Sequence, residues 1–409
     1  MKKYIYILIT TLFFTACSKE KILPGQADSF MKFFGNAFLD TGSDVKQTPD
    51  KGYIVVGTLV TVNEDEYRKT PEDRDIYIVK TDPYGNKIWD KQIGGPFDDY
   101  GNAVQLTSDG GFIIAGTTFD TTSAGNQVSN CLLVKISGDG TIQWNKSFGG
   151  IDNQEGNFVT ITGSGDYLVA GNTTASRVAG GGFEGNPAGE KDIFIMKVST
   201  SGDSLWSEAF GFAGDDVANC IREKSDGGLI ILGTTDHSEA GQDKNNLIII
   251  STNSTGKGPV NKTFGGEGDD YGHDLRVLPD GYLITGTYER NGVSNAYLAK
   301  LKTNIFDTPS FEKYFGDATI TSGNAVFVKQ DGTIAICGSS GINGNRNILF
   351  IKTDTSGELI TMETYGGAGD QWASALDGTA DGGFVIAGSN EFDGNALITL
   401  LKISGDGSL

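Results

Sequence analysis

The chain has 409 residues, of which 59 are glycine and only 9 are proline, and its formal net charge is −20. Abundant glycine beside short β-branched and aromatic runs suits many strands joined by tight turns. So acidic a surface repels phosphate backbones, which argues against nucleic acid as a partner.

The first residues form a targeting segment. Two lysines precede an apolar stretch, Tyr4 to Phe14, that is too short to span a bilayer as a stable helix. Thr15-Ala16-Cys17 follows and resembles the lipobox of bacterial lipoproteins, whose signal is cut before the Cys that then carries the lipid, such as palmitate. The alternative is an ordinary secretory signal with an incidental Cys. A lipid would anchor the protein to a membrane without spanning it.

This resemblance implies a signal peptide over residues 1–16, and a lipidated Cys17 with a short tether over residues 17–28. Ser18 at the next position indicates the outer membrane of the cell envelope. Whether the domain then faces the periplasm or the outside is left open.

A strand-and-turn unit recurs through the rest of the chain, at intervals of roughly 50–60 residues. Its second strand reads "DGGFIIAGT" in one copy and "DGGFVIAGS" in another. Seven copies end on Gly57, Gly116, Gly171, Gly233, Gly286, Gly338 and Gly388. Repeats of this length that are built from short strands are typical of a β-propeller. We therefore predict an all-β fold with seven blades of four strands each.

Within one unit, Asp98 to Ser108, Gly110 to Thr118, Asn130 to Ser137 and Thr141 to Gly150 are predicted strands. The first-to-second and third-to-fourth connections are tight Asp-Gly turns. The second-to-third connections are longer and variable, so they should share one face with the crossovers between blades. We predict that the recognition edge consists of the longer loops of the first four blades: Thr58–Arg74, Thr117–Ser129, Asn172–Lys191 and Thr234–Asn245.

The last unit stops after three strands, at "LLKISGDGSL". Its missing strand has a counterpart at the other end of the domain, where Ser29 to Val45 aligns with a fourth strand and the crossover after it. We predict that this N-terminal strand completes the last blade and closes the ring, which removes an exposed strand edge. Residues 29–409 would then form one domain.

Three tryptophans occupy one column of the predicted fourth strands: Trp89, Trp144 and Trp206. Their Gly-x-x-x-Trp spacing resembles the tryptophan-docking motif of quinoprotein-like propellers, which implies a structural role between blades. The "DGGFIIAG" stretches resemble a group of bacterial propeller-repeat proteins of delta-60 type, including lipoproteins, mostly without assigned function. A redox cofactor is not implied, because no adjacent Cys pair occurs.

The crossovers carry a recurring set of acids that we take as a candidate ligand face: Asp98, Asp99, Asp215, Asp216, Asp269, Asp270 and Asp370, with Asp40 as a further single acid. One interpretation is a Ca²⁺ site, because that ion takes several oxygen ligands. The other is a set of Asx turns and a solvated acidic rim, and on this view no metal or other cofactor is bound.

The predicted innermost strands carry a polar column that should line a central channel: Ser43, Asn102, Asn157, Asn219, His273, Asn324 and Ser374. One interpretation is a hydrogen-bonded, water-filled channel. The other is a small polar ligand held near His273.

No catalytic motif is present in the sequence. The leading hypothesis is a lipid-anchored binding or scaffold module of the cell envelope, whose partner is an envelope protein or a glycan. One alternative is a carbohydrate-active enzyme that uses acids such as Asp215 and Asp269 at the channel mouth. The other is an outer-membrane assembly factor.

Overall fold

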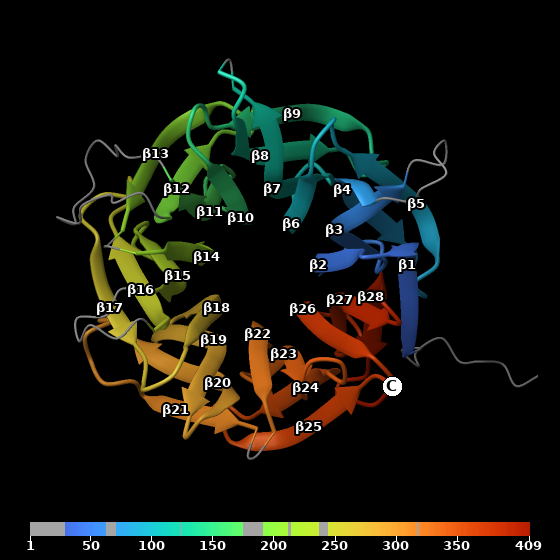
Figure 1. Cartoon of the computed structure of the whole chain (residues 1–409). Helices are drawn as coiled ribbons and strands as arrows, with labels where there is room; N and C mark the ends of the chain where they lie inside the picture. The colour runs from blue at the N-terminus through green and yellow to red at the C-terminus, as the bar shows by residue number, and fades with distance from the viewer. Residues whose placement is uncertain are drawn as a thin grey trace, which may run out of the picture.

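The computed structural model describes residues 29–62, 71–122, 124–174, 191–211, 214–236, 244–316 and 319–409. These residues form 28 strands in seven antiparallel four-stranded sheets arranged around a central axis (Figure 1). The predicted seven-bladed β-propeller is confirmed.

Each blade is ordered from the axis outward. The strands nearest the axis are β2 (Thr41–Gln47), β6 (Asp99–Leu106), β10 (Gln154–Ile161), β14 (Asp216–Glu223), β18 (Tyr271–Leu278), β22 (Thr321–Val328) and β26 (Asp370–Gly378). The second strands are β3 (Tyr53–Val62), β7 (Phe112–Thr121), β11 (Tyr167–Thr173), β15 (Leu229–Thr235), β19 (Gly281–Arg290), β23 (Ile334–Ser340) and β27 (Phe384–Phe392).

Two further strands complete every blade. The third strands are β4 (Pro71–Thr81), β8 (Gln127–Ile136), β12 (Asp192–Val198), β16 (Asn246–Thr252), β20 (Val293–Lys302), β24 (Asn347–Thr353) and β28 (Asn395–Ile403). The outer strands are β5 (Lys87–Ile93), β9 (Ile142–Phe148), β13 (Ser204–Phe210), β17 (Val260–Phe264), β21 (Phe311–Phe315), β25 (Leu359–Tyr365) and β1 (Phe30–Phe38).

The ring closes by the predicted exchange of one strand. β1 pairs antiparallel with β28, with Phe30 opposite Lys402 and Phe34 opposite Ile398, so the N-terminal strand is the outer strand of the last blade. The first and last sequence segments of the domain therefore share one sheet, and neither leaves a blade incomplete. Figure 1 shows β1 and β28 side by side at the junction of the blue and red ends.

The core lies between neighbouring blades. One cluster combines Ile54 and Ile76 of the first blade with Phe112 and Val134 of the second, and similar clusters repeat around the ring. Both faces of the second and third strands are buried, which explains their continuous apolar runs. Apolar burial between blades is thus what holds the sheets in a ring.

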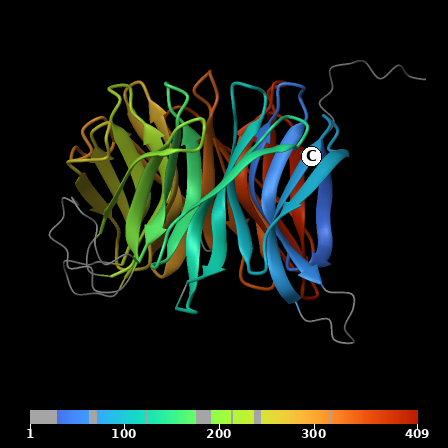
Figure 2. The same ribbon diagram turned by 90° about the horizontal axis from the view of Figure 1, so that it is seen from above.

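The two faces of the ring differ, as the edge-on view in Figure 2 shows. One face carries the tight first-to-second and third-to-fourth turns, and we call it the tight-turn face. The other carries the crossovers and the second-to-third connections, and we call it the long-loop face. Both ends of the described chain lie on the tight-turn face, where Ser29 Oγ donates to the Ser408 carbonyl oxygen at 3.2 Å.

One loop prediction is wrong. Thr117–Ser129 is mostly strand, because β7 continues to Thr121 and β8 begins at Gln127. The residues pair without interruption down to Thr121 opposite Gln127, and threonine, phenylalanine and valine at these positions favour strands. Thr58–Arg74 likewise begins and ends in strand, with residues 63–70 outside the described part. Most of Asn172–Lys191 and Thr234–Asn245 also lies outside it.

Candidate functional site

The polar column of the inner strands lines a central cavity of about 170 Å³. In every blade the pairing register between the first and second strands shifts at this column, for example between Gly101 and Ala103, which leaves Asn102 without a paired residue. The same shift occurs in all the other blades. Each column residue is therefore the extra residue of a β-bulge, and the bulge turns it toward the axis.

The recurring glycine of each second strand lies inside that strand and is required by this bulge. A Cβ added at Gly116 would overlap the carbonyl oxygen of Tyr100, and one at Gly233 would overlap that of Val217. The inner strand thus approaches so closely that a side chain has no room. The recurring glycine and the recurring polar residue therefore belong to the same β-bulge.

The asparagines of the column join successive blades. Each donates from its side-chain amide to a carbonyl oxygen of the next inner strand. The acceptors are Gly156 for Asn102 at 2.9 Å, Ala218 for Asn157 at 3.1 Å, Gly272 for Asn219 at 2.7 Å and Ala373 for Asn324 at 2.7 Å. These bonds satisfy carbonyl groups that would otherwise face the channel. The geometry accounts for the asparagines as part of the scaffold.

His273 departs from this pattern. Its Nε2 lies 3.5 Å from Thr287 Oγ1, and its ring stacks on Tyr271 with centroids 6.3 Å apart. Burial lowers the pKa of His273 to about 4, against an opposing effect of Asp274. The imidazole is consequently neutral at neutral pH.

The acid at the first position of the crossover, which is paired with a second acid in three blades and stands alone as Asp370 in a fourth, holds the preceding blade. Its carboxylate accepts a main-chain N–H near the start of that blade's third strand: Arg74 for Asp98 at 3.1 Å, Lys191 for Asp215 at 2.9 Å, Asn245 for Asp269 at 3.0 Å and Arg346 for Asp370 at 2.9 Å. The Arg346 guanidinium also pairs with Asp370 at 3.0 Å. Burial opposes ionisation of Asp370, but the bonds from Arg346 outweigh it and lower its pKa to about 2.

The second acid of each pair is buried. Asp99 accepts the Gly95 N–H at 2.8 Å, and Asp270 accepts the N–H groups of Gly266 and Glu289, both at 2.7 Å. Burial raises the pKa of Asp99, and it raises that of Asp270 to about 6. Asp216 is also fully buried.

Neighbouring carboxylates in these pairs therefore serve different segments, which is the arrangement of turn-holding acids. Asp40 has partners equivalent to those of Asp270, since it accepts the N–H groups of Asn36 and Val60. Across the described ranges, no group of three or more His, Cys, Asp or Glu side chains converges to hold a metal ion.

Sequence reasoning missed a second column, three residues beyond the bulge. It brings Lys46, Arg222 and Arg276 into the central cavity from three different blades. Lys46 pairs with Asp44 at 2.5 Å, and Arg276 pairs with Asp274 at 2.6 Å. The signal was available, since the four other inner strands have no cation at this position (Gln105, Thr160, Phe327 and Asp377).

Asp44 and Asp274 play equivalent parts in their blades. One oxygen of Asp44 accepts the Val104 N–H of the next blade at 2.9 Å, and one of Asp274 accepts the Val326 N–H at 3.0 Å. Burial alone would raise the pKa of Asp274, but Arg276 and Arg222 outweigh it and lower that pKa. The ionised carboxylate is thus the anchor of a buried charge cluster.

The three tryptophans contact the next blade. A Cβ added at Gly140 would touch the Trp89 ring at 3.2 Å, and Gly202 and Gly256 stand in the same relation to Trp144 and Trp206. These glycines lie in the third-to-fourth turns, and they have positive φ. Trp144 Nε1 also donates to the Thr200 carbonyl oxygen at 3.2 Å. Each indole therefore packs across a blade boundary.

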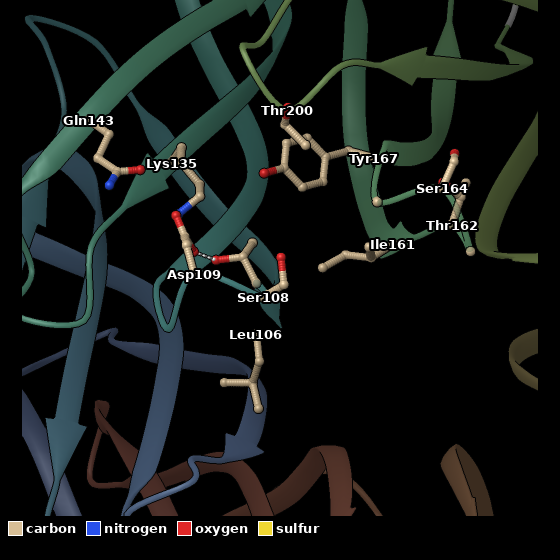
Figure 3. A pocket seen from close by; sticks show the side chains of 13 residues that line it. Leu106, Ser108, Asp109, Lys135, Gln143, Ile161, Thr162, Ser164, Tyr167 and Thr200 are labelled. Atoms are coloured by element: carbon tan, nitrogen blue, oxygen red, sulfur yellow. Dashed lines mark hydrogen bonds and ion pairs between the residues drawn. The ribbon is translucent and has the colours of Figure 1, made fainter.

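A larger cavity of about 720 Å³ opens on the tight-turn face, between the second and third blades (Figure 3). The Lys135–Asp109 pair, 2.9 Å apart, faces Tyr167 across it. This ion pair is not specific to the cavity, because Lys80–Asp50 and Lys402–Asp381 repeat it in other blades. What the cavity adds is a lining of turn hydroxyls, including Ser108, Thr162 and Ser164.

Some predicted features lie outside the described residues. They are the targeting segment, Cys17, the tether and the middle of three of the four loops. Within the part of the chain that the structure describes, no helix is long and apolar enough to cross a membrane.

Ring closure, the inter-blade core and the bulged inner strands define the class of this protein as a seven-bladed β-propeller. No family model matches the chain, and no curated protein matches it. Among solved structures it is similar to Drosophila Semaphorin 2a, with 9% identity and a TM-score of 0.54 over 92% of this chain and 75% of that one.

Two further structures are similar. One is puromycin hydrolase, with 12% identity and a TM-score of 0.53 over 89% of this chain and 52% of that one. The other is a protein of unknown function from Dyadobacter fermentans, with 11% identity and a TM-score of 0.50 over 93% of this chain and 99% of that one. Identities this low show the fold alone.

Proposed function

We propose that this protein is a binding or scaffold module of the cell envelope, lipid-anchored at Cys17, whose long-loop face recognises a protein partner. The observation that carries the proposal is that the crossovers and the second-to-third connections emerge on one face of the ring, whereas both ends of the described chain lie on the other. A propeller is a rigid support, and binding residues commonly lie on the irregular loops that such a support positions.

The long-loop face carries exposed apolar side chains. Ile151 is 83% exposed, Ile342 is 64% exposed and Phe392 is 60% exposed, and all three lie in or beside crossovers or second-to-third connections. Tyr84 and Phe306 are comparably exposed on the tight-turn face, so it is the combination of exposed apolar side chains with the irregular loops that favours a protein partner over a glycan.

The position of the chain ends supports an outward-facing recognition surface. β1 begins on the tight-turn face, so a tether over residues 17–28 would leave the ring from that face. Such a tether reaches at most about 40 Å when fully extended. An anchor at Cys17 would therefore hold the tight-turn face toward the membrane and present the long-loop face away from it. Ser18, which directly follows Cys17, is the basis for proposing the outer membrane as the location of the anchor.

The enzyme alternative gains no support from the acids that motivated it. Asp215 and Asp269 each accept a main-chain N–H of the preceding blade, which gives them a structural task. We therefore propose binding in preference to catalysis by these two carboxylates.

The test is site-specific photo-cross-linking in intact cells. A photoreactive phenylalanine analogue is placed at Ile151, Ile342 or Phe392, and at Tyr84 or Phe306 on the tight-turn face as matched exposed controls. We expect one defined protein adduct from the long-loop positions and not from the controls. The same adduct from Tyr84, or adducts with glycan only, would contradict the proposed partner surface.

The anchor has a separate test. Cys17→Ser should abolish incorporation of labelled palmitate and move the protein from the membrane to the soluble fraction. Retention in the membrane fraction without label would show that an uncleaved signal, and not a lipid, holds the protein there.

A further inference from the structure

The central cavity collects positive charge in a strongly acidic protein. Lys46, Arg222 and Arg276 enter it from β2, β14 and β18, while the chain as a whole carries a formal charge of −20. Their side chains are only 17–24% exposed. Such cations are costly to bury unless an anion compensates them.

The compensation inside the protein is uneven. Lys46 has its own carboxylate in Asp44, but Arg222 and Arg276 share Asp274. Arg276 approaches Asp274 to 2.6 Å, whereas Arg222 remains at 3.4 Å from it. The neighbouring guanidinium and the burial both act against Arg222, and burial lowers its pKa.

A further acid, Asp377, lies near the cluster but forms no ion pair with Arg222 among the described residues. Asp377 of β26 accepts the N–H groups of Gln47 and Gly378, both at 3.0 Å. Burial raises its pKa, so its negative charge is disfavoured. His273, the bulge-column residue of β18, lines the same cavity and is neutral at neutral pH because burial lowers its pKa to about 4.

The guanidinium groups keep donors for a ligand. Among the described residues, Arg276 hydrogen-bonds only through Nη1, to Asp274 and to the Leu275 carbonyl oxygen. Arg222 uses Nη1 for the Ile221 carbonyl oxygen and Nη2 for Asp274. The Phe158 ring lies 4.4 Å from the Arg222 guanidinium and holds it in place. Arginine presents five N–H donors, and two of them match the oxygens of one oxyanion.

The cavity has a suitable size. Its volume of about 170 Å³ is well above the roughly 10–15 Å³ that one water needs. It therefore has room for several waters or one small polyatomic anion, but not for a polymer. The site also breaks the ring symmetry, since only three of the seven blades place a cation at this column.

We propose that the central channel binds one small oxyanion, of the size of inorganic phosphate or acetate, through Arg222 and Arg276 with Lys46 nearby. The anion supplies the negative charge that Asp274 cannot provide to two guanidinium groups at once. This site is distinct from the long-loop face, and its test does not depend on a protein partner.

The experiment is a thermal-melting titration of the full chain with sodium phosphate, and separately with sodium acetate. Sodium chloride keeps the ionic strength constant, because any salt screens surface charge. A ligand that binds only the folded state raises the melting temperature in a saturable way. We expect saturable stabilisation by at least one oxyanion. No stabilisation beyond that of chloride by either anion would overturn the proposal.

Variants then locate the site. Arg222→Gln should weaken the apparent affinity at least tenfold, whereas Arg74→Gln, which removes an arginine paired with Asp98 outside the cavity, should leave it unchanged. Because Arg222→Gln disturbs a buried cluster and could prevent folding, Gln105 offers a gentler pair of changes in the same lining. Gln105→Glu should weaken binding and Gln105→Lys should strengthen it. Equal affinity in both Gln105 variants and the parent would refute the placement.

Discussion

Two columns of the central channel, three residues apart on the same strands, teach different lessons. The bulge column is polar in every blade, and its asparagines join one blade to the next through the same bond. The column with Arg222 and Arg276 differs from blade to blade, and three of its members bring positive charge into the cavity. The column that repeats in every blade belongs to the scaffold. The column that differs between blades is where we propose that a ligand binds.

The largest expected effect tests the charged column. Asp274→Ala removes the one carboxylate that two guanidinium groups share, so we expect a loss of about 3–5 kcal/mol in the free energy of unfolding. Asp44→Ala is the matched control, because Asp44 makes the equivalent inter-blade bond but pairs with a single lysine. Its loss should be smaller. Urea denaturation of both variants measures the difference, and equal losses would mean that the arginines do not depend on Asp274.

The second prediction concerns Asp270, another buried acid, which directly precedes β18, the strand that contains Asp274. Burial raises the pKa of Asp270 to about 6 in the folded state, above its unfolded value near 4. The folded state therefore holds the proton more tightly. Its contribution to stability is complete below about pH 4 and is lost as the pH rises through about 6, by about 3 kcal/mol.

Asp270→Asn should accordingly remove a fall in stability between pH 4 and pH 6 that the parent shows. Unfolding free energies measured across this range, as the difference between variant and parent, isolate the effect. Asp269→Asn is the control, because hydrogen bonds from Asn245 lower the pKa of Asp269. If the fall disappears in the Asp269 variant and persists in the Asp270 variant, the assignment is reversed.

The smallest effect tests the bulge column. Asn219→Ala deletes the bond to the Gly272 carbonyl oxygen and should cost about 1 kcal/mol. Ser374→Ala changes the same column where no side-chain hydrogen bond exists among the described residues, so its cost should stay within about 0.5 kcal/mol. Chemical denaturation distinguishes the two. A negligible cost for Asn219→Ala would mean that water replaces the amide fully.

Much of the fold was predictable because it repeats. The glycine spacing, the Asp-Gly turns and the unfinished last unit indicated seven blades and a closing N-terminal strand. The seven four-stranded sheets confirm the first prediction, and the pairing of β1 with β28 confirms the second. The strand character of Thr117–Ser129 was not predictable in this way. Its polar residues look like a loop, but their β-branched side chains continue the hairpin to Thr121 and Gln127.

The number of blades, the order of strands within each blade and the polar column of the inner strands could be predicted from the amino-acid sequence, because they depend on local patterns that recur along the chain. The role of this column became clear from the strand pairing, because the bulge is defined by the register in which Gly101 lies opposite Gly116. Only the ring brings Lys46, Arg222 and Arg276 into one cavity. Residues far apart in sequence share an electrostatic environment only after the seven sheets have closed around a common axis.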